Sequence, residues 1–415
     1  MSEGARKRKG RALVIGGSMG GLFAANLLHR NGWEVQVYER VAEELSGRGA
    51  GLATHEELMI DLRRAGITID DTLGVAVGSR VTLDRRGDLV LELPRAQIFS
   101  AWNRLYALLR AVLPPASYFL GRSLLRVEQR GDRVTAVFED GGREEADLLI
   151  AADGIRSTVR GQFLPEAQPR YAGYVGWRGL VDEAQLSAPT HQDLFMHLGF
   201  CLPAHEQMLG YPVPGKANTT EPGKRRYNFV WYRPADEESE LARLLTDASG
   251  KKHDFSIPPP LISDRMIAEV RQAAAEVLAP QFTEVVHKTK EPFFQPIYDL
   301  ESPQLVFDRV VLLGDAGFVA RPHCGMGVTK AADDAAVLVD SIEAHGGDLD
   351  KGLARYNAKR VEFGSFIVNH ARHLGAYMQA QTKTEQEREM AERYRSAEVV
   401  MRETAVPPEF RSALD

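Results

Sequence analysis

The chain has 415 residues, of which 44% are hydrophobic and 26% charged, and its formal net charge of −6 gives no sign of a nucleic-acid-binding protein. This length suits two or three domains. No apolar run reaches the roughly 18 residues of a membrane helix, and the basic stretch Met1–Gly10 lacks the apolar core of a secretory signal, so we expect a cytoplasmic protein without a membrane partner.

The first predicted unit is a strand, a glycine-rich turn, a helix and a second strand. Ala12–Ile15 is a β-branched run, Gly16–Gly21 reads Gly-Gly-Ser-Met-Gly-Gly, a helical pattern follows, and Glu34–Glu39 alternates. Glycines let a pyrophosphate approach the backbone, the helix N-terminus favours its charge, and the acid Glu39 suits ribose hydroxyls. Ser18 stands where the usual pattern has its middle glycine, and its hydroxyl is able to donate to the pyrophosphate. We therefore predict dinucleotide binding rather than a plain strand-turn-helix-strand unit.

The next elements alternate between short helices and strands. Ser46–Leu52 is a glycine-rich loop. The periodicities predict helices over 56–65 and 102–109, two strands between 78 and 93, a meander over 123–147 and a buried strand over 148–152. That last strand ends in Asp153-Gly154.

A second strand with an acidic end lies near the carboxyl third of the chain. Val310–Leu313 is apolar and β-branched, Gly314-Asp315 follows, and a loop containing Pro322 and Gly325 leads to a helix that begins at Gly327. In an open α/β sheet, ligands bind at the carboxyl ends of the strands. Alone, this pattern is only weakly specific.

Aromatic residues dominate the segment from Tyr171 to about Thr283. Alternating strings such as Tyr227–Tyr232, separated by turn signals, predict an antiparallel sheet inserted into the first domain. Helices are expected from Asp350 to about Thr384 and from Glu385 to Glu403.

The turn at Gly16–Gly21, Asp153-Gly154 and Gly314-Asp315, in this order and spacing, resemble the single-component (class A) FAD-dependent aromatic hydroxylases of the para-hydroxybenzoate hydroxylase type. Short strings such as Tyr171–Tyr174 and Arg321–His323 are most similar to 2,6-dihydroxypyridine 3-hydroxylase-like monooxygenases.

The resemblance implies an α/β fold: a Rossmann-like FAD-binding domain over 10–75, 100–170 and 284–365, an inserted mainly antiparallel β-sheet substrate domain over 76–99 and 171–283, and C-terminal helices over 366–415. It also implies non-covalent FAD, NAD(P)H as a transient co-substrate, and O2. A homodimer is compatible with the resemblance.

The resemblance carries cofactor roles to particular residues. The pyrophosphate would lie on the glycine turn, the AMP ribose on Glu39, the ribityl chain on Asp315, and the flavin ring over the loop that precedes the second helix. The residues implied in cofactor binding are Gly16, Gly17, Ser18, Met19, Gly20, Gly21, Glu39, Arg40, Arg48, Leu124, Asp153, Asp315, Pro322, Gly325, Met326, Gly327 and Val328. The sequence departs from the family at Phe318, Thr329 and Trp102, where members often carry His, Asn and Arg.

By resemblance, NAD(P)H reduces FAD, and a flavin C4a-hydroperoxide hydroxylates a small electron-rich aromatic or N-heteroaromatic ring such as a hydroxypyridine. A general base poised near neutrality would activate the ring hydroxyl. The catalytic candidates are His55 and His323, followed by Tyr211 as a ligand of the ring hydroxyl; each is also readily explained as a structural residue.

Other readings of the sequence stay open. The same flavin chemistry serves epoxidation and oxidative decarboxylation, and an FAD-binding regulatory protein without turnover is a further alternative. An NAD-dependent dehydrogenase would leave Asp153-Gly154 and Gly314-Asp315 unexplained. We expect no metal, because the two cysteines Cys201 and Cys324 and the scattered histidines lack ligand spacing.

Overall fold

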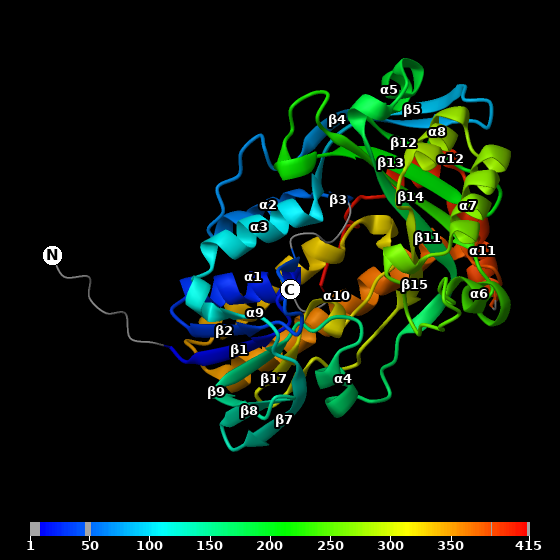
Figure 1. Ribbon diagram of the computed structural model, residues 1–415. Coiled ribbons are helices and arrows are strands. Elements are labelled where there is room, and N and C mark those ends of the chain that lie inside the picture. The colour runs from blue at the N-terminus through cyan, green and yellow to red at the C-terminus, as the bar shows by residue number, and fades with distance from the viewer. Residues whose placement is uncertain (1–8, 46–50, 383, 413–415) are drawn as a thin grey trace.

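The computed structural model describes residues 9–45, 51–382 and 384–412, which form two sheet-based halves lying side by side (Figure 1). The first half is built on a six-stranded sheet. Its strands lie in the order β16 (Val306–Phe307), β17 (Val310–Leu312), β10 (Leu148–Ala151), β1 (Arg11–Ile15), β2 (Glu34–Tyr38) and β6 (Tyr118–Phe119). Strands β17, β10, β1 and β2 run parallel, so their carboxyl ends meet at one edge.

The first sheet is buried between helix α1 (Met19–Arg30), which contacts β1, β2 and β10, and the predicted meander over 123–147, which contacts β1 and β10. Burial from both sides explains why its strands read as apolar runs. All four residues of β10 are 0% exposed. Helix α9 packs against α1, α2 and α10, and α1 also packs against α3. The helices of this half are α1 (Met19–Arg30), α2 (Glu56–Arg64), α3 (Trp102–Val112), α4 (Thr158–Phe163), α9 (Gly327–Ala344) and α10 (Leu349–Gly375). The predicted meander forms the antiparallel strands β7 (Leu124–Arg130), β8 (Arg133–Phe138) and β9 (Arg143–Ala146).

The second half is an eight-stranded, mainly antiparallel sheet. Its strands lie in the order β15 (Phe293–Asp299), β11 (Arg170–Asp182), β14 (Arg226–Pro234), β13 (Gln207–Val213), β12 (His197–Cys201), β4 (Val75–Leu83), β5 (Leu89–Ala101) and β3 (Gly51–Ala53). One face packs on α7 (Asp264–Val277) and α8 (Pro280–Lys288) through a core that contains Trp231. The opposite face packs on Ala53, Tyr377 and the carboxyl-terminal helix α12 (Ala397–Glu403).

The predicted α/β class with a parallel first sheet and an antiparallel second sheet is confirmed. Three details differ from the expectation. Strand β15 lies within the range 284–365 expected for the first domain, yet it hydrogen-bonds to β11 in the second sheet. Strands β4 and β12 run parallel. Helices α7 and α8 were not predicted, because the aromatic strands around them dominate the pattern of this segment. The buried residues Met266, Val270 and Ala274 of α7 have helical spacing and carry the missing signal.

The expected helix over 350–384 is shorter in the structure. Helix α10 ends at Gly375, a single 3-10 turn spans Ala376–Met378, and α11 covers Glu385–Tyr394. Within the described segments, no helix combines the length and apolar character needed to cross a membrane.

Asp61 on α2 generates a prediction about stability. Its side chain is 6% exposed, 3.8 Å from the Arg64 guanidinium. Burial, reinforced by the negative charge of Asp333, raises the pKa of Asp61 from 3.8 to about 7. The folded state therefore binds the Asp61 proton more tightly than the unfolded state, and stability falls as pH rises from about 4 to about 7.

We expect Asp61→Asn to stabilise the protein by on the order of 2 kcal/mol at pH 8, with the gain shrinking as the pH is lowered toward 5. The measurement is the unfolding midpoint of both proteins at pH 5.5, 6.5 and 8. A difference that does not change with pH would contradict the assignment.

Candidate cofactor and substrate site

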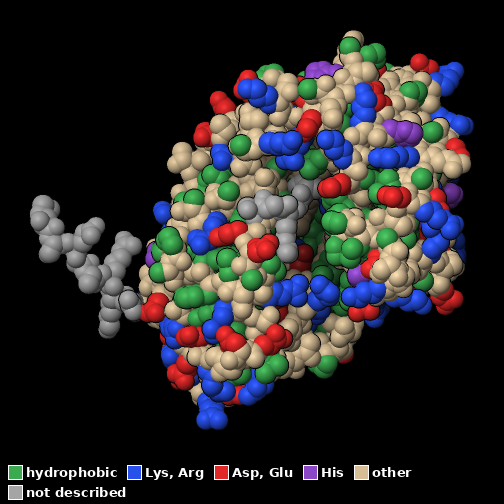
Figure 2. Space-filling view, in the orientation of Figure 1, with side chains coloured by type: hydrophobic (Ala, Val, Ile, Leu, Met, Phe, Trp, Pro, Cys, Tyr) green, Lys and Arg blue, Asp and Glu red, His purple; other side chains and the backbone are tan. Residues whose placement is uncertain are grey.

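The three motifs singled out in the sequence converge at the carboxyl edge of the first sheet. Strands β1, β10 and β17 are neighbours, and the ladder continues beyond them, with Ala152 N–H donating to Ile15 O at 2.8 Å and Leu313 N–H to Ala151 O at 2.9 Å. A Cβ placed on Gly16 would lie 3.0 Å from Asp153 Cα. Figure 2 shows a hollow between the two halves, with Lys and Arg side chains on its rim.

The glycines of the first turn are required by packing as well as by any ligand. Gly16 has φ +102°, which L-residues rarely adopt. A Cβ on Gly21 would overlap the Gly16 carbonyl oxygen, and one on Gly17 would overlap the Tyr118 hydroxyl. Gly20 has Leu313 3.0 Å from its Cβ position. Helix α1 therefore requires glycine at positions 16 and 21, where a Cβ would meet backbone atoms, whereas at 17 and 20 it would meet the ends of side chains.

Ser18 is the N-cap of α1, and Met19 is the first residue of this helix. The Ser18 side chain makes no capping hydrogen bond. The first turn of α1 therefore lacks a side-chain cap at the end where the helix dipole favours an anion.

Glu39 connects the end of β2 to the glycine turn. Its Oε2 accepts from Gly17 N–H at 2.9 Å and its Oε1 from Val41 N–H at 2.9 Å, and the residue is 6% exposed. Arg40 is exposed, and Leu124 is 8% exposed in the core of the first half. Arg48 lies outside the described residues.

Asp153 caps helix α4 and retains an unused acceptor. Its Oδ2 accepts from Thr158 N–H at 2.8 Å, whereas its buried Oδ1 has no hydrogen-bond partner within the described chain. Burial raises the pKa of Asp153. Gly154 follows with φ +79° and open space at its Cβ position. An orphaned carboxylate oxygen beside the phosphate turn suits a hydroxyl donor from a bound dinucleotide.

Gly314, which precedes Asp315, is held by buried charges. Lys330 Nζ donates to Gly314 O at 3.0 Å, and Asp334 Oδ2 accepts from Gly314 N–H at 3.0 Å. Lys330 and Asp334 pair at 3.0 Å, and Arg360 Nε donates to Asp334 at 2.6 Å. The Asp315 side chain is accessible at the edge of the sheet, yet desolvation by the protein around it raises the pKa of its carboxyl. Lys330 and Asp334 bind the backbone of Gly314 and leave the Asp315 carboxyl accessible to a ligand.

The loop from Pro322 to Gly327 passes beside this edge and starts α9. Pro322–Cys324 forms a 3-10 turn, and Gly325 adopts the left-handed conformation at φ 68°. Met326 is the N-cap of α9, Gly327 its first residue, and Val328 packs on the first core. No atom of another described segment lies within 4 Å of the Gly327 Cβ position. The loop therefore offers an open, glycine-lined approach to the N-terminus of an 18-residue helix.

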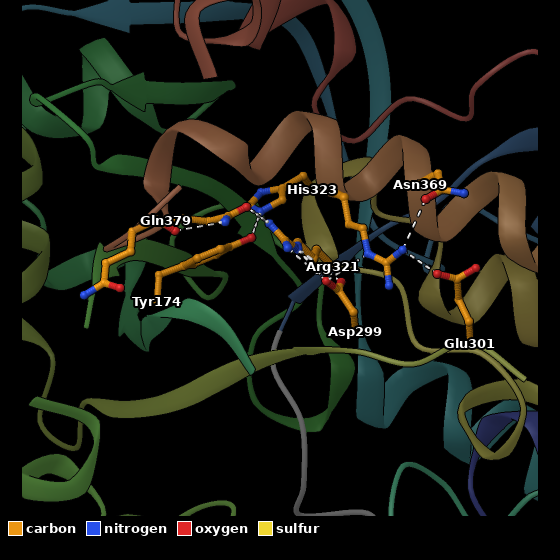
Figure 3. A network of polar contacts seen from close by, with 9 residues as sticks. Tyr174, Asp299, Glu301, Arg321, His323, Asn369 and Gln379 are labelled. Carbon is orange, nitrogen blue, oxygen red and sulfur yellow. Dashed lines mark hydrogen bonds and ion pairs between the residues drawn. The ribbon is translucent and has the colours of Figure 1, made fainter. Parts of the chain in front are cut away.

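His323 is enclosed by aromatic side chains. It is 1% exposed, its Nε2 lies 2.6 Å from the Tyr174 hydroxyl, and its Nδ1 has no partner among the described residues. Beside it, Arg321 binds Asp299, at 2.9 Å for the nearest pair of atoms, and the amide of Gln379 (Figure 3). Burial, together with the Arg321 charge, lowers the pKa of His323 to about 3.

His55 has both ring nitrogens engaged. Its Nε2 is 3.3 Å from Ala405 O, and a carbonyl can only accept, so Nε2 carries the hydrogen. Its Nδ1 then accepts from Thr329 Oγ1 at 2.9 Å. Burial lowers the pKa of His55. Desolvation therefore lowers the pKa of both histidines, which disfavours His323 as a base poised near neutrality, whereas a catalytic role of His55 stays a prediction.

Tyr211 lies on the face of the second sheet that points toward the first half. A Cβ on Gly51 would lie 2.6 Å from the Tyr211 ring and 3.0 Å from Asn228 Cγ, and Gly51 N–H donates to Asn228 Oδ1 at 3.0 Å. Burial raises the pKa of Tyr211 to about 12, against the opposing charge of Arg178. Its hydroxyl is thus protonated at neutral pH and able to donate.

Strand β3 joins this sheet face to the loop from Pro322 to Gly327. Its first residue, Gly51, contacts Tyr211 and Asn228, and Ala53 Cβ is 3.3 Å from the Cβ position of Gly325. The Cβ directions of Gly51 and Ala53 point to the same face of this three-residue strand, so the structure brings Tyr211 and the 322–327 loop to one side of β3.

Three side chains at this site were not recognised in the sequence. Lys330 and Asn228 are polar residues at buried positions, and such a residue inside an apolar pattern was an available signal. Asn228 Nδ2 is buried without a partner in the described chain. Thr329 was noted only as a departure from the family. No group of three or more His, Cys, Asp or Glu side chains in the described segments is placed to hold a metal ion.

Comparisons with known proteins identify the family. A family model described as "FAD binding domain-like" matches residues 171–299. The chain is 30% identical to 2,6-dihydroxypyridine 3-monooxygenase of Paenarthrobacter nicotinovorans over 89% of this chain and 91% of that protein. The solved structure of 2,6-dihydroxypyridine-3-hydroxylase from Arthrobacter nicotinovorans is similar with a TM-score of 0.84 and 29% identity, covering 92% and 95% of the two chains. Klebsiella pneumoniae HpxO complexed with FAD and uric acid is similar with a TM-score of 0.73 and 25% identity, covering 95% and 93%.

A parallel sheet with its glycine and acidic turns at one edge, joined to an antiparallel sheet, defines a fold of the para-hydroxybenzoate hydroxylase type. The chain belongs to the family of FAD-dependent class A aromatic monooxygenases. The family resemblance inferred from the motifs is confirmed.

The glycine turn yields a matched pair of variants. Gly21→Ala is expected to abolish most FAD binding, because the new Cβ would overlap the Gly16 carbonyl oxygen and force α1 away from β1. Gly161→Ala on α4 is the control, since within the described chain no atom outside its own helix turn lies within 4 Å of its Cβ position. The measurement is flavin content after purification and titration with FAD. Equal FAD affinity in the two variants would contradict the packing argument.

The charges around Gly314 yield a second pair. Asp334→Ala is expected to lower the free energy of unfolding by about 3–5 kcal/mol, because it leaves Lys330 and Arg360 buried without their shared carboxylate. Asp340→Ala on the same helix removes an exposed ion pair with Arg64 and is expected to cost about 0–1 kcal/mol. The measurement is denaturant titration of both variants. Similar losses in the free energy of unfolding would contradict the claim that the buried contacts of Asp334 contribute more than the exposed ion pair of Asp340.

Proposed function

We propose that this monooxygenase uses NAD(P)H and dioxygen to hydroxylate a small N-heteroaromatic ring that carries hydroxyl groups, such as a hydroxypyridine. The relatives that support this substrate class act, by their names, on 2,6-dihydroxypyridine, or were crystallised with uric acid. Both molecules are nitrogen-containing rings that carry oxygen substituents on ring carbons. The observation that carries the proposal is the set of three polar side chains, Tyr211, Asn228 and Arg178, on one face of the second sheet, beside β3 on the side that also meets the 322–327 loop.

The cofactor fits the first half. Three polar groups would hold FAD: the unused Oδ1 of Asp153, the Ser18 hydroxyl and the accessible carboxyl of Asp315. The open Cβ position of Gly327 would leave room for the flavin ring. Bound FAD supplies the transfer of electrons from NAD(P)H and the activation of dioxygen. The N-terminus of α9 would stabilise negative charge on the reduced ring by roughly 0.3–2 kcal/mol.

The substrate would lie against the second sheet. Tyr211 is a neutral donor for a ring oxygen, and Asn228 Nδ2 is a second donor without a partner in the described chain. Arg178 is partly buried; its Nη1 donates to the neutral Gln295 at 3.1 Å, and its Nε has no partner within the described segments. A guanidinium bonded to a neutral amide favours the deprotonated form of a ring hydroxyl. Substrate activation by this field needs no histidine base.

The histidines would then act as neutral hydrogen-bonding groups that shape the pocket. His55 fixes Thr329 in the first turn of α9, and His323 fixes the loop through Tyr174. Both residues are nearly fully buried, which keeps water away from this side of the loop.

The proposal predicts a yellow protein whose NADH or NADPH oxidation is stimulated by hydroxypyridines. His55→Ala and His323→Ala are expected to retain flavin and to lose substrate-stimulated turnover by about tenfold or more, because misplacing the reacting groups raises the barrier. Tyr211→Phe is expected to raise KM more than it lowers kcat. The measurements are flavin absorbance, NAD(P)H consumption and product analysis across a panel of hydroxypyridines and phenols.

Two outcomes would count against the proposal. Peroxide formation without product across the whole panel would exclude hydroxypyridines as substrates. Product formation with phenols alone would mean that the substrate class is phenols instead. Loss of flavin in the histidine variants would mean that these residues hold the cofactor half together.

A further inference from the structure

The carboxyl-terminal segment Ala397–Ala405 reaches the site from the far end of the chain. Ala405 donates its N–H to His323 O at 2.7 Å and accepts at its carbonyl from His55 Nε2 at 3.3 Å and from Gln97 Nε2 at 2.8 Å. One backbone unit therefore bridges the two histidines, which lie 268 residues apart in the sequence (323 minus 55). Ala405 adopts φ 55°, a conformation uncommon for a residue other than glycine.

The same backbone unit packs on the flavin loop. A Cβ on Gly325 would lie 3.3 Å from Ala405 Cα and 3.3 Å from Ala53 Cβ. Ala405 thus lies against the loop at its left-handed residue. Any shift of Ala405 would move the support of Gly325 and the hydrogen-bond partner of His323 together.

Arg80 fastens this segment to the second sheet. It is 0% exposed, and its Nη1 donates to Met401 O at 2.5 Å and Thr404 O at 2.6 Å, the carbonyls at the end of α12. Its Nη2 donates to Gln97 Oε1 at 2.8 Å. A cation at a helix C-terminus is favourable. The three hydrogen bonds that this buried guanidinium makes to Met401, Thr404 and Gln97 therefore hold the segment and Gln97 in place.

The contact with Ala405 also sets the tautomer of His55. Because the Ala405 carbonyl takes the Nε2 hydrogen, Nδ1 is the acceptor, and the Thr329 hydroxyl must donate to it. Thr329 stands in the first turn of α9, two residues after Gly327. The chain of hydrogen bonds thus runs from Ala405 through His55 to the helix end beside the proposed flavin position.

We infer that the segment Ala397–Ala405 is a positioning element of the active site, which Arg80 and Gln97 hold in place so that Ala405 fixes the His55 tautomer and the Pro322–Gly327 loop. The inference rests on the proposed function for its consequence in turnover. Its structural content, the dependence of His55 and of the loop on Ala405, is independent of any substrate.

The most informative variant is Gln97→Glu. It keeps an acceptor for Arg80 but replaces the amide that donates to Ala405 O by a carboxylate that repels it. Arg80→Met is a second variant, which removes the bonds to Met401 O and Thr404 O while retaining an apolar side chain in a buried site. Arg402→Ala is the matched control on the same helix, because its side chain is 62% exposed and pairs with Glu398.

The first readout is hydrogen exchange of the FAD-loaded protein, measured by mass spectrometry, together with the ¹⁵N shifts of the His55 ring. In Gln97→Glu and Arg80→Met we expect exchange of peptides covering 397–405 and 320–330 to rise about three- to tenfold, with loss of the single-tautomer signature of His55. Peptides from β1 and β10 and the control variant should match the wild type. Unchanged exchange at 320–330 and an unchanged His55 signature, with exchange raised at 397–405, would overturn the inference.

The second readout is the fraction of NAD(P)H consumption that yields hydroxylated product. We expect this fraction to fall about threefold or more in both variants at unchanged flavin content, because a displaced loop admits water. If this fraction equals that of the wild type in variants whose 397–405 segment exchanges faster, the segment only packs against the site and does not position it. If the wild type forms no product from any ring in the panel, the proposed function fails, and the exchange experiment still decides the placement.

Discussion

The buried charges around Gly314 are the interaction on which the cofactor half depends. A strand that ends inside the protein leaves a backbone N–H and C=O that require partners. Asp334 and Lys330 supply one each, and Arg360 of the next helix donates to both Asp334 and Asp333, so that two carboxylates meet two cations. Because Lys330 and Asp334 stand on α9, the same contacts that satisfy Gly314 also hold the N-terminus of α9 against the end of β17. Asp315 is thereby left at the edge of the sheet beside that helix end.

The departures from the family pattern have local compensations. Phe318 is 2% exposed, and a Cβ on Gly364 of α10 would overlap its ring, so the small residue on the helix makes room for the large one on the loop. Thr329 is 1% exposed and bonds to His55. Each change is absorbed by a residue far away in the sequence, which is how a fold tolerates substitutions next to its cofactor site.

Charge is distributed unevenly across the site. Next to the loop, Arg321 is paired with Asp299, and both histidines are buried and neutral. On the sheet face, the Arg178 guanidinium bonds to the neutral Gln295. The sheet face therefore presents a cation bonded to a neutral amide, while the loop side presents dipoles and apolar surface. This asymmetry agrees with an enzyme that must hold an electron-rich ring and exclude water.

The sequence by itself determined the elements whose signals are local: the turn at Gly16–Gly21, the strands that end at Asp153 and Asp315, and the α/β class that follows from them. These signals are periodicity, glycine and strand-end acids, which a single stretch of chain carries. Only the tertiary structure decided the state of the site. Other segments desolvate His55 and His323 and so lower the pKa of both, and Ala405 reaches both from the end of the chain. Burial and hydrogen-bond partners depend on which segments pack together, and no local pattern encodes that.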